Sequence, residues 1–332
     1  MASVIKLTWL CLGLALLLMA AGGAHARDVG FQALSIPNGA DKPIKIGVWY
    51  PTDAAASPQP LGLQTQTVAP DAAVAGTRLP LVVISHGTGG SFMDHYDVAL
   101  ALAKAGFVVA ALSHTGDTFD DHSRAARIDQ RPAQLKRLID YMLGEWPGRA
   151  AIDPKRVGAY GFSSGGFTVL ASIGGQPDLA LVRPHCAAHP IGFDCLLIRG
   201  TPEPDPSTLP PRAAFTADPR IKAAVISAPA LGYTFGREGL AHVKVPIQLW
   251  RAGADTVLPN PWYAEAVIDA LPRPAAYFVV PDAEHFDFLA PCSPALAKAA
   301  PDICKEPPGF DRTKFHQMLD AAVVRFFKEK IG

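Results

Sequence analysis

The sequence predicts an α/β protein with a mostly parallel, doubly wound sheet, helices on both faces and an inserted cap. Short apolar runs of strand length alternate with segments of helical periodicity, a pattern typical of right-handed strand–helix–strand crossovers. Two predicted strands run directly into glycine-rich loops, at residues 86–90 and 161–166. A proline-rich segment at residues 176–219 interrupts the alternation and is interpreted as a cap or lid. Ligands of such sheets bind beyond the carboxyl ends of the strands, so we expect function there.

The overall composition is that of a globular protein. The 332-residue chain is 49% hydrophobic and 18% charged, and its formal net charge is zero. This length suits one large α/β domain or two small ones, and we expect a single domain over residues 27–332. A neutral balance without a basic run argues against nucleic acid or an anionic membrane as the main partner. A small molecule is the expected partner, and no feature of the sequence specifies an oligomeric state.

Residues 1–26 have the features of a secretory signal peptide. A positive charge precedes the apolar run 7–21, and a small-x-small pattern ends at Ala26. A membrane anchor is the alternative, but the apolar run is short for a span and carries a cleavage pattern. We expect cleavage near Ala26, a mature chain without a stable membrane anchor, and a periplasmic or secreted location.

Export makes the cysteine count informative. Apart from Cys11 in the predicted signal, the chain contains Cys186, Cys195, Cys292 and Cys304. An even number in an oxidising compartment suggests two disulfides. Each of the pairs Cys186–Cys195 and Cys292–Cys304 lies in one proline-rich loop, so this pairing is favoured among the three that are possible. Metal ligation by Cys186, His189 and Cys195 is an alternative, but no fourth ligand follows at a suitable spacing, and no metal is expected.

The first elements are predicted strands. Residues 29–36 and 44–51 alternate like two antiparallel strands, and Asn38 with Gly39 forms a turn signal between them. Residues 52–78 are rich in Ala, Pro, Gln and Thr and lack periodicity, so we predict a surface excursion.

The α/β alternation follows. Residues 79–85 form a continuous apolar run, as expected of a strand covered on both faces. A helix is predicted at 96–105, a buried strand at 107–112 and an amphipathic helix at 133–144. After the cap, strands are predicted at 221–227, 245–250 and 276–280, with a closing helix at 310–330.

Residues 156–160 form a predicted strand that ends in Gly161-Phe162-Ser163-Ser164-Gly165. This is the G-x-S-x-G pattern of a nucleophile elbow. A serine on a sharp strand-to-helix turn has unfavourable backbone angles, and small residues two positions away relieve the crowding. A Gly/Ser-rich turn is the simpler interpretation of five residues alone. The strand before the motif and the predicted helix after it favour Ser163 as a nucleophile.

A serine nucleophile needs a general base and an acid that orients the base. In this architecture the chain order is Ser, then Asp or Glu, then His. Asp255 directly follows one predicted strand and His285 follows the last, so both lie at the sheet edge of Ser163. A turn-forming Asp and a structural His are the simpler interpretations of each residue alone. His114 precedes the elbow and His316 lies within a helix, so both are weaker candidates for the base.

The tetrahedral intermediate of acyl transfer needs two donors for its oxyanion. We predict the N–H groups of Ser164, at the helix start, and Thr88, in the glycine-rich loop, while His86 braces that loop. Four aromatic residues near the predicted mouth are candidates for an apolar substrate pocket, although core packing is the commoner role. These are Phe92, Phe119, Phe162 and Trp262.

These motifs resemble the α/β-hydrolase fold. From about Gly47 to the C-terminus, the chain is similar to secreted dienelactone hydrolase-like proteins and to platelet-activating-factor acetylhydrolases. Dienelactone hydrolases carry a cysteine nucleophile where this sequence has Ser163, so that comparison says little about the substrate. The acetylhydrolase comparison fits the two glycine-rich motifs, at residues 86–89 and 161–166, better. The resemblance implies hydrolysis of short-acyl or other small esters through a covalent acyl-enzyme, and the chemistry needs no cofactor. The alternatives are a lactonase, amidase or peptidase on the same fold, or a non-catalytic binding protein.

Overall fold

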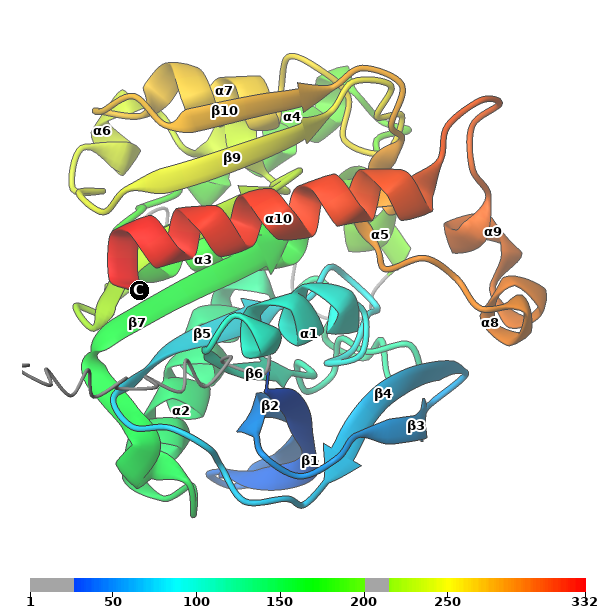
Figure 1. Ribbon diagram of the computed structural model, residues 1–332. Coiled ribbons are helices and arrows are strands. Elements are labelled where there is room, and N and C mark those ends of the chain that lie inside the picture. Colours follow the sequence, from blue (N-terminus) through cyan, green and yellow to red (C-terminus); the bar gives the residue numbers. More distant parts are fainter. Residues whose placement is uncertain (1–26, 201–214) are drawn as a thin grey trace, which may run out of the picture.

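The computed structural model describes residues 27–200 and 215–332. Within these residues the chain forms a 10-stranded sheet in the order β10-β9-β8-β7-β5-β6-β2-β1-β4-β3 (Figure 1). The predicted signal peptide and residues 201–214 of the predicted cap lie outside the described residues. The predicted fold class is therefore confirmed: a mixed sheet, parallel at its centre, carries helices on both faces.

The two predicted N-terminal strands form an antiparallel hairpin. β1 (Asp28–Asn38) pairs with β2 (Asp41–Thr52), and Gly39 lies in the turn with φ of +63°, which favours glycine. β2 then pairs antiparallel with β6 (Val108–Leu112), which joins this hairpin to the parallel part of the sheet.

The prediction of a surface excursion at residues 52–78 was wrong. β3 (Ser57–Leu61) and β4 (Gln64–Pro70) form a second hairpin, and β4 pairs with β1. Burial alternates along β4 with the period of two that a strand requires, but two of its inward-facing side chains are the polar Gln64 and Gln66. The Gln66 side-chain oxygen accepts a hydrogen bond from the Trp49 indole at 2.7 Å. The sequence of β4 therefore lacks the alternation of apolar and polar residues by which a strand is predicted.

The centre of the sheet consists of parallel strands. They are β5 (Leu79–Ser85), β6, β7 (Ile152–Phe162), β8 (Ile221–Ser227), β9 (Ile247–Ala252) and β10 (Ala276–Val280). Because all of them run in one direction, the segments that follow β5, β7, β9 and β10 leave the sheet at the same edge.

Helices cover both faces of this sheet, with an apolar core on each side. α1 (Tyr96–Lys104) and α10 (Arg312–Ile331) pack together on one face, in front of the sheet in Figure 1. α2 (Arg131–Gly144) and α3 (Ser164–Ser172) pack together on the other. No helix in the described part of the chain is both long and apolar enough to span a membrane.

The remaining helices are short. They are α4 (Val182–Ala188), α5 (Phe193–Gly200), α6 (Arg237–Leu240), α7 (Ala264–Ala270), α8 (Pro294–Ala299) and α9 (Pro301–Cys304), with 3₁₀ turns η1 (Ile128–Gln130), η2 (Arg149–Ala151), η3 (Leu179–Leu181), η5 (Gly232–Thr234) and η6 (His285–Phe288). Both predicted disulfide pairings are confirmed: Cys186–Cys195 links α4 to α5, and Cys292–Cys304 closes the segment that contains α8 and α9. The sequence did not predict α8 and α9.

Candidate active site

Ser163 lies on the sharp turn between β7 and α3. Its backbone angles, φ +54° and ψ −119°, are in a region that residues with a side chain rarely adopt and that costs about 1–3 kcal/mol. Hydrogen bonds hold the turn from two sides. The Ser163 N–H donates to the Ser227 carbonyl at 2.9 Å, and the Ser163 carbonyl accepts from Phe167 at 3.1 Å and Ala230 at 2.9 Å. The backbone thus presents the hydroxyl above the carboxyl end of β7.

Two glycines make this turn possible for steric reasons. A Cβ atom on Gly161 would collide with the carbonyl oxygen of Gly165, and one on Gly165 would collide with the carbonyl oxygen of Ser85. Both obstacles are backbone atoms that cannot rotate away. The glycines of the G-x-S-x-G pattern therefore allow a close approach of β5, β7 and α3.

The structure brings the side chains of Ser163, His285 and Asp255 into one hydrogen-bonded chain. The Ser163 Oγ lies 3.1 Å from Nε2 of His285, and Nδ1 of His285 lies 2.8 Å from Oδ2 of Asp255. A carboxylate only accepts, so Nδ1 carries the proton and Nε2 is free to accept from the serine hydroxyl. The second Asp255 oxygen accepts from the N–H groups of Val257 at 3.0 Å and Leu258 at 2.7 Å. Asp255 is therefore locked in the orientation that faces His285.

A buried network that sequence reasoning missed supports the turn that carries His285. The Asp287 carboxylate accepts from the Glu284 N–H at 2.8 Å and from two nitrogens of Arg312, at 3.1 and 2.9 Å. Both side chains of the Asp287–Arg312 ion pair are fully buried. Burial raises the pKa of Asp287, and the Arg312 charge opposes that rise. The only sequence signal was an acidic residue two positions after the candidate base.

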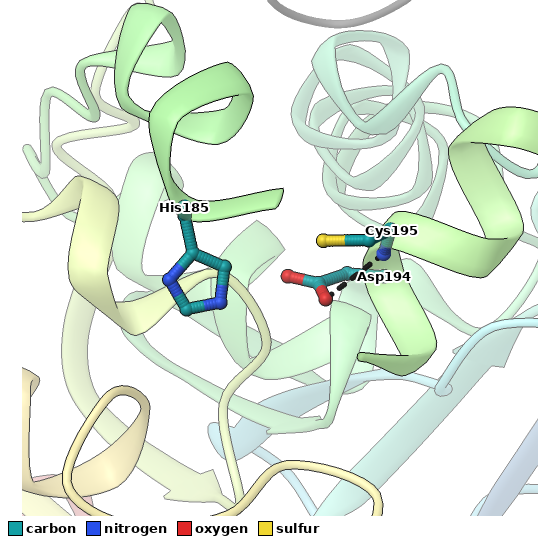
Figure 2. A group of neighbouring side chains, drawn as sticks. All are labelled: His185, Asp194 and Cys195. Carbon is teal, nitrogen blue, oxygen red and sulfur yellow. Dashed lines mark hydrogen bonds between the residues drawn. The ribbon is translucent and has the colours of Figure 1, made fainter. Parts of the chain in front are cut away.

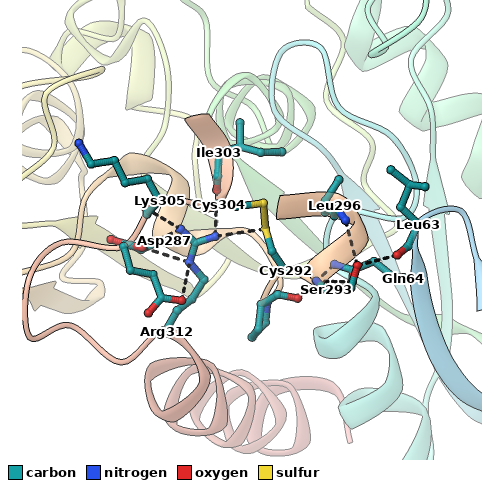
Figure 3. Close-up of a disulfide and its surroundings, with 12 residues drawn as sticks. Leu63, Gln64, Asp287, Cys292, Ser293, Leu296, Ile303, Cys304, Lys305 and Arg312 are labelled. Atoms are coloured by element: carbon teal, nitrogen blue, oxygen red, sulfur yellow. Dashed lines mark hydrogen bonds and ion pairs between the residues drawn. A yellow bond between two sulfur atoms is a disulfide. The ribbon is translucent and has the colours of Figure 1, made fainter. Parts of the chain in front are cut away.

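Arg312 also connects this turn to the α8–α9 segment (Figure 3). Its guanidinium donates to the carbonyls of Ile303 at 2.9 Å and Lys305 at 3.1 Å, beside the Cys292–Cys304 disulfide. At the far end of the segment, Ser293 and Gln64 join it to the β3–β4 hairpin. One arginine thus fixes the position of His285 relative to a distant wall of the site.

The two weaker candidates for the base have structural partners. His316 Nδ1 lies 2.5 Å from Asp97, and its Nε2 donates to the Asp287 carbonyl at 2.8 Å. Burial lowers the pKa of His316, but the Asp97 carboxylate outweighs burial, so the pKa is raised. His114 lies 2.8 Å from the Ser85 hydroxyl and 2.9 Å from Gln134, and burial lowers its pKa well below the usual range. Neither ring contacts Ser163.

The glycine-rich loop after β5 is held by buried polar groups. His86 accepts from the His114 N–H at 2.8 Å, which ties the loop to β6. Arg131 donates to the His86 carbonyl and forms a buried ion pair with Asp117, and Asp117 in turn accepts from the Gly89 N–H at 2.8 Å. These contacts fix the conformation of the loop before any ligand binds.

Thr88 and Ser164, the predicted oxyanion donors, lie next to each other. Their hydroxyl oxygens are 2.5 Å apart, so the loop and the start of α3 are joined at this point. Among residues 27–200 and 215–332, no group accepts a hydrogen bond from the N–H of Thr88 or of Ser164. Helix N-termini leave such N–H groups unpaired and favour negative charge.

A cavity of about 470 Å³ opens beside Ser163 and His285. Its apolar walls come from elements far apart in sequence: Leu61 and Leu63 of the β3–β4 hairpin, Met93, Phe119, Phe193 of α5, Phe286, Leu289, and Leu296, Ala299, Ala300 and Ile303 of the α8–α9 segment. The hairpin and the α8–α9 segment were not expected to contribute.

Two of the four predicted pocket aromatics line this cavity and two do not. Phe119 and Phe162 line it. Phe92 instead packs in the core, with its ring centroid 6.4 Å from that of Trp49. Trp262 packs beside the end of α4, with its ring centroid 4.8 Å from that of His189. The assignment of Phe92 and Trp262 was wrong because nearness in sequence to the mouth did not determine the direction of the side chain.

α4 and α5 bring together His185, Asp194 and Cys195, a group with the chemistry of metal ligands (Figure 2). The Cys195 sulfur is bonded to Cys186, so neither sulfur is a thiolate. The Asp194 carboxylate already accepts from the Cys195 N–H at 3.0 Å and the Tyr233 hydroxyl at 2.8 Å. The disulfide thus removes both sulfur ligands from the alternative metal set of Cys186, His189 and Cys195.

Comparison with solved structures identifies the fold. A ferulic acid esterase from Streptomyces cinnamoneus superposes with a TM-score of 0.64 at 18% sequence identity, covering 94% of this chain and 92% of that chain. Neither a scan against protein-family models nor a search of curated proteins gives a match. The sheet, the elbow and this likeness define the class: the chain has the α/β-hydrolase fold.

Proposed function

We propose that the protein is a serine hydrolase of carboxylic esters, with Ser163 as nucleophile, His285 as general base and Asp255 as the acid that orients it. The hydrogen-bonded chain from Ser163 through His285 to Asp255, at the wall of a preformed cavity, carries this proposal. The residue types, their order and their positions at strand ends follow the logic of a catalytic triad.

The proposed reaction has two acyl-transfer steps. Nε2 of His285 takes the proton of Ser163 while Oγ forms a bond to the ester carbonyl carbon. The tetrahedral intermediate then collapses, and the imidazolium returns the proton to the departing alcohol oxygen. Water, activated by the same imidazole, attacks the acyl-enzyme and releases the acid. Asp255 holds the tautomer and stabilises the imidazolium at each stage.

The N–H groups of Thr88 and Ser164 are the proposed donors to the oxyanion. Both donors are preorganised. Buried contacts of His86, Asp117 and Arg131 fix the glycine-rich loop that carries Thr88. The turn at Ser163 fixes the start of α3, where Ser164 lies. Donors that need no reorganisation are the most effective, and each is typically worth about 10²–10³ in rate.

The cavity favours a small, largely apolar ester. Its volume of about 470 Å³ lies within the usual range for small-molecule sites, about 300–1,000 Å³. The name of the structural neighbour, a ferulic acid esterase, supports ester hydrolysis. The resemblance to platelet-activating-factor acetylhydrolases supports a short acyl group.

The two disulfides support an exported protein. Such bonds persist in oxidising compartments and are rare in the cytosol. We therefore propose a periplasmic or secreted location for the mature chain.

Turnover of p-nitrophenyl esters from acetate to decanoate, by wild type and Ser163→Ala, tests the function. We expect wild-type activity and a loss of a thousandfold or more in the variant, the size typical for removal of such a nucleophile. Matched p-nitroanilides show whether amides are cleaved as well. Wild type that hydrolyses no ester, or a variant that keeps full activity, would overturn the proposal.

A further inference from the structure

Asp94 is a carboxylate in the wall of an otherwise largely apolar cavity. It follows the glycine-rich loop by a few residues and lines the same cavity as Ser163 and His285. Sequence reasoning did not single it out. The chemistry proposed above gives it no role, because Asp255 already partners the base.

The two carboxylate oxygens of Asp94 differ in their contacts. Oδ1 accepts from both the N–H and the hydroxyl of Ser91, at 3.1 and 3.0 Å. Oδ2 lies over the Cα of Gly90, at the position that a Gly90 side chain would occupy. No group in residues 27–200 or 215–332 donates a hydrogen bond to Oδ2. One oxygen therefore fixes the side chain, and the other is left as an acceptor at the cavity wall.

Asp94 is only partly buried, so water can reach this acceptor in the free protein. A ligand that displaces this water must bring a donor of its own, or the acceptor is left unpaired inside the complex. An unpaired buried polar group costs about 1–3 kcal/mol, and more when it is charged. Ligand sites typically combine apolar walls with a few such placed polar groups, which determine specificity.

We propose that Asp94 binds a hydroxyl group of the substrate, so that the site takes esters whose acyl or alcohol part carries a free hydroxyl. This rests on the proposed esterase function and adds the substrate class. A neutral hydroxyl is favoured over an ammonium group, because most of the cavity wall is apolar and moving a charged group out of water costs more than moving a neutral one. Sites that hydrogen-bond a hydroxyl discriminate strongly against analogues without one, since the site's own polar group is then left unpaired.

Isosteric pairs of esters test this proposal. On the alcohol side the pair is hydroxyethyl butanoate and propyl butanoate. On the acyl side it is methyl para-hydroxyphenylpropanoate and methyl para-methylphenylpropanoate, with the para-aminomethyl ester as the ammonium probe. We expect kcat/KM of the wild type to favour the hydroxyl member of at least one pair by about ten- to hundredfold, the effect of one hydrogen bond to a charged group.

Asp94→Asn is the informative variant. Its amide oxygen can keep both bonds from Ser91, and its NH₂ group then replaces the acceptor at Oδ2 with a donor. The substrate hydroxyl can still accept a weaker, neutral hydrogen bond from this NH₂ group, so we expect the hydroxyl preference to fall by about tenfold, while thermal unfolding shows a folded protein. Asp302→Asn removes an exposed carboxylate next to Ile303 in the cavity wall and should leave the preference unchanged.

Binding of the same esters to Ser163→Ala, measured by calorimetry, separates this proposal from the esterase function because it needs no turnover. A hydroxyl preference in binding supports the role of Asp94 even if the chemistry is not ester hydrolysis. Equal binding and equal turnover of both members of both pairs would overturn the role of Asp94 and leave the esterase proposal standing. A preference for the ammonium ester would overturn the hydroxyl assignment.

Discussion

Replacement of Arg312 by methionine tests whether the buried network beneath His285 holds the site together. In Arg312→Met the Asp287 carboxylate stays buried but loses both guanidinium bonds. The carbonyls of Ile303 and Lys305 lose their donor as well. Removal of one partner from a buried ion pair costs about 3–5 kcal/mol, because the other charge is left uncompensated. Domains are stable by about 5–15 kcal/mol, so the variant should fold but unfold at clearly lower urea concentration.

Activity should fall along with stability in Arg312→Met. The turn that carries His285 begins with a capping box in which Asp287 takes part, and this carboxylate is the group that Arg312 holds. A misplacement of about 1 Å in a catalytic group can cost about a hundredfold in rate. We expect kcat on p-nitrophenyl acetate to fall by about that factor. Acetate is the appropriate substrate because it needs little of the cavity wall that Arg312 also supports.

Two further variants make this test decisive. Lys314→Met removes a cation from an exposed position on the same helix and should leave both stability and kcat within error of wild type. The double variant Asp287→Leu/Arg312→Met removes both charges and should recover part of the lost stability, since an apolar pair avoids the unpaired charge. If Arg312→Met loses less than about 1 kcal/mol, the ion pair does not hold this turn and the reasoning is refuted.

Two other predictions follow from the geometry. Asp255→Asn should keep the fold but lower kcat by about 10⁴. The new amide can donate to Nδ1 of His285, which favours the tautomer whose Nε2 carries the proton and cannot accept from Ser163. Unchanged kcat would exclude Asp255 as the orienting acid. Burial raises the pKa of Asp94 to about 6, against the Arg131 charge, and burial keeps nearby His86 neutral by lowering its pKa well below the usual range. The carboxylate acceptor is therefore present above about pH 6 and lost as the pH falls through 6. The kcat/KM ratio of a hydroxyl ester to its methyl isostere should fall over that interval, because a ratio removes every pH effect that the two substrates share. A ratio that is flat from pH 5 to 8 would count against this role.

Much of this site could be read from the sequence because its parts are local. The glycines around Ser163 mark a turn that only small residues permit, and the structure shows the backbone atoms that impose this. Asp255 and His285 each follow an apolar strand directly. In a parallel sheet that position alone places them at one edge. The structure brings Asp255 within hydrogen-bond distance of His285, and His285 within hydrogen-bond distance of Ser163. The disulfides were equally local, since each joins two cysteines of one short segment.

The walls of the site were decided by the tertiary structure alone. The β3–β4 hairpin buries glutamines in place of apolar residues, so its strand pattern was hidden. Leu63 and Leu296 lie more than two hundred positions apart and meet at one cavity, and Arg312 reaches from the last helix to the turn of His285. Phe92 and Trp262 were misassigned for the same reason. Backbone crowding and strand direction follow from neighbours in the chain, whereas the direction of a side chain and the partner of a buried charge depend on which distant segments pack against them.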